Sequence, residues 1–70
     1  MATEITTILI DNNKAEQTYG VYQMDERGIC WEQEIYAYDE KAERGAAFAK
    51  AQKQARDWAD EHKAKIETNW

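Results

Sequence analysis

Few side chains in this sequence could carry the chemistry of an active site. His62 is the only histidine and Cys30 the only cysteine. A lone imidazole on an apolar helix stripe is typical of a half-buried core residue, and a cysteine without a nearby base is typical of a small apolar filler. Glu32 and Glu34, two positions apart on one strand face, could form a carboxylate pair for acid–base catalysis. A chain this short has few residues with which to enclose them in a pocket, so a solvated acidic strand is the better interpretation.

Two further sequence signals of an active site are missing from the chain. It has no glycine-rich loop of the kind that holds phosphate, and no group of His, Cys, Asp and Glu at metal-ligand spacing. We therefore expect a protein that is not an enzyme and that uses neither a metal nor a cofactor.

The size of the chain limits how it can be stabilised. Seventy residues with one cysteine form one domain over 1–70, close to the lower limit at which a core stabilises a chain without disulfides. Three Trp, four Tyr, one Phe and six Ile supply most of the apolar area. We expect a marginally stable monomer or a homodimer.

The start of the sequence does not resemble a secretion signal. Residues 1–4 contain a glutamate and no basic residue, and the apolar run that follows is too short for a signal peptide. No apolar run approaches the roughly 18 residues that a transmembrane helix needs. The expected location is the cytoplasm, where Cys30 would stay reduced.

Charge is distributed unevenly along the chain, whose net charge is −5. Residues 1–40 hold nine carboxylates against Lys14 and Arg27, whereas residues 41–70 hold seven basic residues against five acidic ones. If the first part forms a sheet and the second a helix, the sheet side is acidic and favours basic partners.

The longest regular pattern predicts a helix from Asp39 to Ile66. Its apolar positions recur at the spacing of three and four that lines one side of a helix: Ala47, Phe48, Ala51, Ala55, Trp58, Ala59, His62 and Ile66. Asp39 is a suitable N-cap, although Gly45 weakens the first turns, so the helix either begins near Arg44 or uses the glycine for close approach to the sheet. The tail 67–70 either folds back on the core or is a loose terminus.

Three strands are predicted before the helix, at Thr3 to Ile10, about Glu16 to Met24, and Ile29 to Tyr38. A type I turn from Asp25 to Gly28 pairs Asp25 with Ile29 and sets the register of the second hairpin. With that register, the residues beneath the helix are Tyr19, Val21, Ile29, Trp31, Ile35 and Ala37. A one-residue slip would exchange Tyr19 and Val21 for Tyr22 and Met24. The predicted fold is α+β: a three-stranded antiparallel meander with one long C-terminal helix packed on one face (βββα).

The sheet face away from the helix is the candidate partner-binding site. The residues expected there are Tyr22, Glu32, Glu34, Tyr36 and Tyr38, with Cys30, Met24 and Glu16 beside them. Aromatic side chains supply contact area and carboxylates orient a basic partner. The alternative is a solvated face whose tyrosines serve only as good strand formers.

Strand one is the candidate edge for pairing with another copy or with a partner. It places apolar side chains on both faces, with Ile8 and Ile10 on one and Ile5 and Leu9 on the other. The residues expected to form a dimer or strand-edge contact are Ile5, Thr7 and Leu9.

These observations favour a non-catalytic protein that binds another protein, one with a basic and possibly nucleic-acid-handling surface. In size, acidity and lack of a catalytic cluster the chain resembles the small inhibitors that phages and mobile elements direct at host machinery, such as anti-CRISPR proteins. This resemblance is one of general character over the whole chain. The alternative is a nucleic-acid-binding module, because a three-stranded sheet with a C-terminal helix is similar in outline to the arm-type DNA-binding domains of phage integrases. The glutamates of the sheet would repel phosphate, so binding to nucleic acid is not expected.

Overall fold

The computed structural model describes residues 4–70 of the chain. Within this range the elements are β1 (Ile5–Asn13), β2 (Thr18–Asp25), β3 (Cys30–Ala37), the short 3-10 helix η1 (Lys41–Glu43), α1 (Arg44–His62) and β4 (Lys65–Thr68). The predicted α+β fold, an antiparallel meander followed by a long helix, is confirmed, and β4 is an additional strand. Thr3, the predicted start of the first strand, lies outside the described residues.

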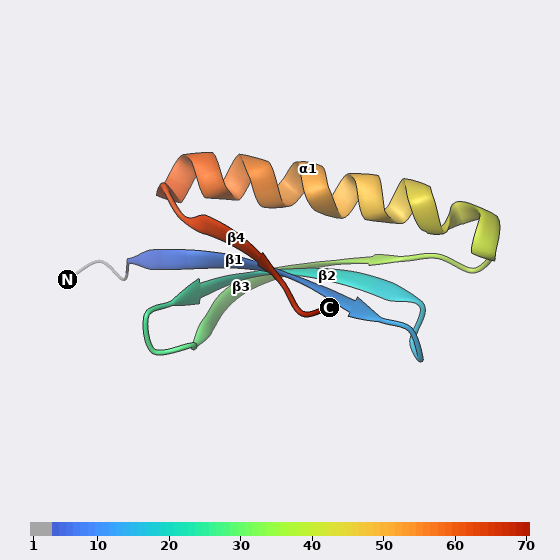
Figure 1. The fold of residues 1–70 in the computed structure, drawn as a ribbon, viewed down its shortest axis with the longest axis horizontal. Helices are drawn as coiled ribbons and strands as arrows, with labels where there is room; N and C mark the ends of the chain where they lie inside the picture. The colour runs from blue at the N-terminus through green and yellow to red at the C-terminus, as the bar shows by residue number, and fades with distance from the viewer. Residues whose placement is uncertain (1–3) are drawn as a thin grey trace.

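The four strands form one sheet in the order β3-β2-β1-β4. β2 pairs antiparallel with both β1 and β3, and β4 lies parallel to β1. The helix therefore carries the chain from one edge of the sheet to the other, and it lies along one side of the sheet (Figure 1). Among the described elements none covers the opposite side, which we call the open face.

The core lies between the sheet and α1 and is centred on β1 and β2. Ile8 and Val21 are fully buried, and Ile10 and Tyr19 are nearly so. Ile8 and Ile10 pair with Gln23 and Val21 of β2, which also lie on the helix side. The predicted position of Tyr19 and Val21 beneath the helix is confirmed, and the one-residue slip does not occur in β2. Loss of one large side chain here is expected to cost about 2–5 kcal/mol, a large share of the stability of so small a protein.

The helix contacts the sheet through a stripe of small residues. Ala47, Ala51 and Ala55 are buried, and Phe48 and Trp58 pack beside them. The spacing of these residues is the one that the sequence predicted, and it gives a helix that can approach the sheet closely because its central contacts are methyl groups.

The start of the helix agrees with one of the two alternatives predicted for it, whereas its end does not. The 3-10 turn η1 is capped at Glu40 rather than at Asp39, and the Glu40 N–H donates to Oε1 of Glu43 at 3.4 Å. The α-helix then begins at Arg44, as predicted from the weakening effect of Gly45. It ends at His62 because Lys63 adopts a left-handed conformation with φ of 54°. The predicted extension to Ile66 is therefore wrong.

After the helix the chain turns back onto the sheet. Ile66 belongs to β4 and pairs with Ile8, and Asn69 donates its backbone N–H to the carbonyl of Ile10 at 3.2 Å. Trp70 then stacks edge-on against Tyr19 and Phe48. Of the two predictions for the tail, folding back on the core is confirmed.

Candidate functional site

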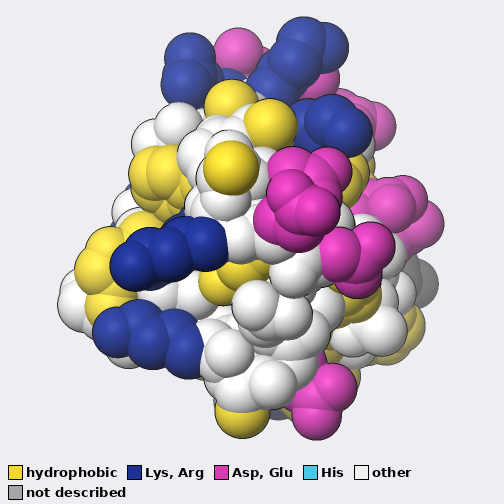
Figure 2. All heavy atoms as spheres, turned by 90° about the vertical axis from the view of Figure 1, so that its right-hand side faces the viewer, with side chains coloured by type: hydrophobic (Ala, Val, Ile, Leu, Met, Phe, Trp, Pro, Cys, Tyr) yellow, Lys and Arg dark blue, Asp and Glu magenta, His cyan; other side chains and the backbone are white. Residues whose placement is uncertain are grey.

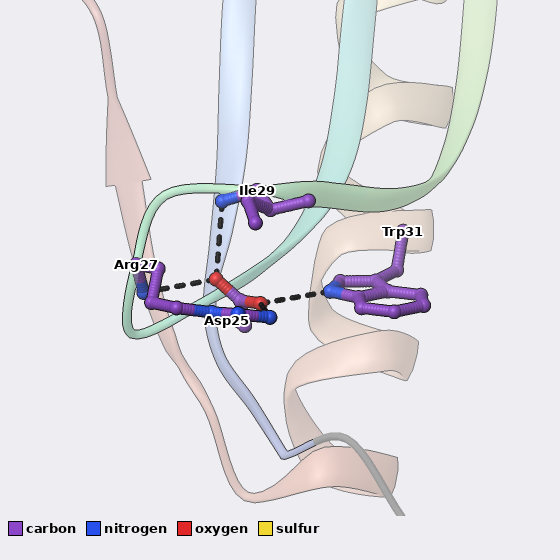
Figure 3. A network of polar contacts seen from close by, with 4 residues as sticks. All are labelled: Asp25, Arg27, Ile29 and Trp31. Carbon is purple, nitrogen blue, oxygen red and sulfur yellow. Dashed lines mark hydrogen bonds and ion pairs between the residues drawn. The ribbon is translucent and has the colours of Figure 1, made fainter.

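A carboxylate at the end of β2 organises the turn between β2 and β3. Asp25 accepts hydrogen bonds from the backbone N–H groups of Arg27 (2.9 Å) and Ile29 (3.1 Å), from Nη2 of Arg27 (3.1 Å) and from Nε1 of Trp31 (2.9 Å). Figure 3 shows the carboxylate enclosed by these donors. The hydrogen bond from Trp31 is the main cause of a lowered pKa at Asp25, and the donors at Ile29 and Arg27 lower it further against the opposing effect of burial.

Trp31 lies where the two strands change register. The turn pairs Asp25 with Ile29 as predicted, and Met24 lies opposite Cys30. The next pair is Gln23 with Glu32, so Trp31 is an extra residue on β3, which is the definition of a β-bulge. Because side chains alternate along a strand, one extra residue exchanges the two faces of everything after it.

The bulge corrects the predicted face of most of β3. Four of the predicted partner-binding residues lie on the helix side rather than on the open face: Glu32, Glu34, Tyr36 and Tyr38. Val21, which is buried under the helix, pairs with Glu34, and Tyr19 pairs with Tyr36. Tyr38 is only 9% exposed and belongs to the core. The predicted register of Tyr19 with Ile35 is wrong for the same reason, and Ile35 lies on the open face with 47% of its surface exposed.

Burial of Tyr36 beside the helix has an electrostatic consequence. Its pKa is raised above the usual phenol value, first by burial and then by the carboxylates of Glu34 and Asp57. Tyr36 is one of the partly buried side chains that pack against the core on the helix side.

Strand β1 is not an edge strand, so the predicted edge contact at Ile5, Thr7 and Leu9 is wrong. β1 lies between β2 and β4. A register shift between Ile5 and Thr7 turns Ile5 to the helix side, where it is buried in the core. Thr7 and Leu9 lie on the open face instead, and the free edges of the sheet belong to β3 and β4.

The open face is built from alternate residues of all four strands. Its members, placed by the pairing of the strands, are Thr7, Leu9, Asp11, Asn13, Thr18, Gly20, Tyr22, Met24, Cys30, Gln33, Ile35, Ala37, Lys65 and Glu67. The predicted positions of Tyr22, Met24 and Cys30 are thus confirmed. Leu9, Tyr22 and Met24 form its half-buried centre, and Ile35 is exposed beside them.

Tyr22 lies flat across the middle of this face. A Cβ atom at Gly20 would come within 2.5 Å of the Tyr22 Oη atom, so the ring occupies the space above the glycine. Burial is the first cause of a raised pKa at Tyr22, and the charge of Asp11 adds to it. Because Gly20 has no side chain, the ring of Tyr22 can cover the backbone of β2 and add to the apolar surface of the open face.

The charge on the open face is small, which differs from the acidic face that we expected. Lys65 Nζ lies 3.0 Å from an Oε1 atom of Glu67, and Asp11 accepts a hydrogen bond from the side-chain amide of Asn69. The glutamates of β3 project on the helix side along its free edge. The open face is therefore apolar at its centre and has carboxylates only near its border.

The residues considered for catalysis are separated in space. His62 is the last residue of α1 and is half-buried, whereas Cys30 is an exposed free thiol at the start of β3. Among residues 4–70 no group of three or more His, Cys, Asp or Glu side chains is placed to hold a metal ion. None of the helices in the same range combines the length and apolar character that crossing a bilayer requires.

Comparison with known proteins gives no match to a family model, to a curated protein or to a solved structure. The site is therefore interpreted from its own geometry. Leu9 lies on the side of β1 opposite Ile8 and Ile10, as predicted. Sequence reasoning missed Ile35 as a member of the open face, because the bulge and the hydrogen bond between Trp31 and Asp25 that accompanies it have no local sequence pattern.

Proposed function

We propose that this chain is a small non-catalytic interaction protein that binds another protein through its open face. The observation that supports the proposal is the apolar sheet surface of Leu9, Tyr22, Met24 and Ile35, which no described element covers. Contiguous apolar patches on soluble proteins commonly mark binding sites for other proteins. Aromatic and Met side chains are also enriched in the centres of such interfaces.

The dimensions of the sheet limit the contact that this face can make. Three strands of eight or nine residues and one of four cover roughly 450 Å² in projection, less than the approximately 800 Å² that each partner contributes to a standard interface. A partner that also reaches the free edge of β3 gains the missing area. That edge carries Glu32 and Glu34, both exposed, so a basic partner surface is favoured there.

The proposal includes a biological setting. The cytoplasm is the proposed location, since a reducing compartment keeps the exposed thiol of Cys30 unpaired. An inhibitor of host machinery, of the kind that phages and mobile elements produce, fits a small acidic chain that acts by binding alone. DNA binding through the open face has less support, because its single lysine, Lys65, is paired with Glu67.

The test compares two variants with the same charge change. Ile35→Lys places a charge in the apolar surface, whereas Ala49→Lys places one at an exposed position on the helix. Both variants and the unmodified protein are immobilised, captured proteins are quantified by mass spectrometry, and the solution mass of each is measured by light scattering. Spectra of the two variants confirm that the fold is retained.

We expect one captured protein, or a dimer in solution, that persists with Ala49→Lys and is lost with Ile35→Lys. A dimer lost in this way would identify a second copy as the partner. Equal capture by both variants would contradict the proposal, as would a monomer that retains no protein above background.

A further inference from the structure

A second surface feature lies on the helix side of the sheet, apart from the open face. A shallow cavity of about 420 Å³ opens where the β1–β2 turn meets the start of α1. Its principal lining residues are Asn12, Lys14, Tyr19, Arg44, Phe48 and Trp70. Figure 2 views this end of the molecule and shows basic side chains next to hydrophobic ones on one flank, with carboxylates on the other.

Three aromatic rings form the apolar wall of the cavity. The ring of Phe48 lies 5.0 Å from that of Tyr19, and Trp70 meets Phe48 at 5.8 Å and 65° and Tyr19 at 6.3 Å and 67°. These edge-to-face contacts hold the indole of Trp70 steeply inclined to the rings of Tyr19 and Phe48. Trp70 is nevertheless 59% exposed, so part of its ring is free to stack against a ligand.

Two cations face this wall. Arg44 donates from Nε to Oη of Tyr19 at 2.9 Å, which fixes the plane of the guanidinium and leaves the N–H groups of Nη1 and Nη2 for another acceptor. Lys14 reaches the cavity from the β1–β2 turn. Within residues 4–70, neither cation forms an ion pair with a carboxylate. The chain has a net charge of −5, yet this cavity is lined by two unpaired cations beside aromatic rings, so it is locally positive.

Gly45 adds an independent observation. It lies in the first turn of α1, where glycine costs about 1 kcal/mol relative to alanine. A Cβ at this position would meet nothing within 4 Å, so packing does not require the glycine. Gly45 also lines the cavity, and its missing side chain keeps the cavity open. The Oδ1 atom of Asn12, in the same lining, is buried without a hydrogen-bond partner.

From this arrangement we propose that the cavity binds a small planar aromatic anion. The ring of the ligand stacks on Trp70 beside Phe48, and its anionic group accepts hydrogen bonds from Arg44 and Lys14. The volume is within the range of small-molecule sites. Nucleoside monophosphates and aromatic carboxylates both have this chemistry, and the experiment separates them.

The test is a titration of the full chain followed by two-dimensional amide NMR. The probes are adenosine monophosphate, indole-3-acetate, uncharged adenosine and inorganic phosphate. We expect one of the two aromatic anions to shift the signals of Gly45, Phe48 and Trp70, with a dissociation constant of about 1 mM or lower. Adenosine and phosphate alone bind more weakly, since each makes only half of the contacts.

Two variants make the test independent of folding. Arg44→Gln removes the guanidinium and is expected to weaken binding about tenfold. Gly45→Leu fills the cavity with a good helix former, so it should abolish binding while raising the midpoint of thermal unfolding. Ala46→Leu is the matched control, because Ala46 is exposed and lines a different hollow together with Tyr36; this variant should bind normally.

The outcomes are distinct. Tighter binding of the monophosphate assigns a nucleotide, and tighter binding of the indole acid assigns an aromatic carboxylate. Absence of shifts with either anion at 10 mM, roughly ten times the expected dissociation constant, would overturn the proposal, as would Gly45→Leu that binds as well as the unmodified protein. Because the open face takes no part, these results are independent of those for Ile35→Lys.

Discussion

Two neighbouring substitutions in β3 test whether the bulge at Trp31 has inverted the strand. Without the bulge, Ile35 would lie beneath the helix and Tyr36 on the open face. With it, Ile35 is 47% exposed and Tyr36 packs against the core. Ile35→Thr and Tyr36→Thr introduce the same residue, a good strand former, on opposite faces of the sheet.

The structure gives the expected magnitudes. Full burial of an isoleucine contributes about 1.5–3 kcal/mol, so truncating a half-exposed one should cost at most about 1 kcal/mol. Truncation of a fully buried aromatic residue costs about 3–5 kcal/mol, and the half-buried ring of Tyr36 should therefore cost about 2 kcal/mol. The free energy of unfolding of a protein this small falls by about 1 kcal/mol per molar urea, so the urea midpoints of the two variants should differ by about 1 M.

The assay is urea unfolding followed by far-UV circular dichroism at two protein concentrations. If the protein dimerises through the open face, its urea midpoint will depend on protein concentration. A loss of stability caused by lost dimerisation can therefore be distinguished from one caused by lost packing within the monomer. If Ile35→Thr costs more free energy of unfolding than Tyr36→Thr at the lower concentration, β3 has the register without the bulge and the assignment of the open face is wrong.

Two further predictions concern the turn and the centre of the open face. The pKa of Asp25 is lower in the folded state than in the unfolded state, so the unfolded protein binds more protons in acid. The stability that this carboxylate contributes is therefore complete above the usual carboxyl pKa, and it is lost as the pH falls towards the folded-state pKa. Asp25→Asn should therefore unfold with less pH dependence below about pH 4 than the unmodified protein, in urea titrations at several pH values. Gly20→Ala should displace the ring of Tyr22 from β2, which NMR contacts between Tyr22 and the backbone of residue 20 would detect. Unchanged contacts would show that the ring does not lie over the strand.

Much of the fold could be predicted because it depends on periodic patterns. The three strands of the meander, the turn at Asp25 and the stripe of alanines each have a local sequence signature, and the structure contains all three features. The pairing of Asp25 with Ile29 is the pairing that the turn type predicts.

The errors arose where a contact between separate residues overrides the local pattern. Trp31 has no pairing partner on β2, and its indole N–H donates a hydrogen bond to Asp25, six positions earlier. Neither residue type predicts this contact. β4 was not predicted because it is short and polar, and because Ile66 lies four residues after His62, which is a helical spacing. The helix ends before it at Lys63, whose left-handed conformation is uncommon for a residue other than glycine.

The bulge connects the stability of the protein to its proposed function. The helix contributes three buried alanines to the core, so large side chains must come from the sheet near the start of the helix, and Tyr19, Tyr36 and Tyr38 supply them. Inversion of β3 brings Tyr36 and Tyr38 under the helix and moves Ile35 outward. In the register without the bulge the open face would carry two glutamates and would attract cations, whereas in the observed register it is apolar. The kind of surface that this chain offers to a partner therefore depends on one inserted residue and on the carboxylate that accepts a hydrogen bond from its side chain.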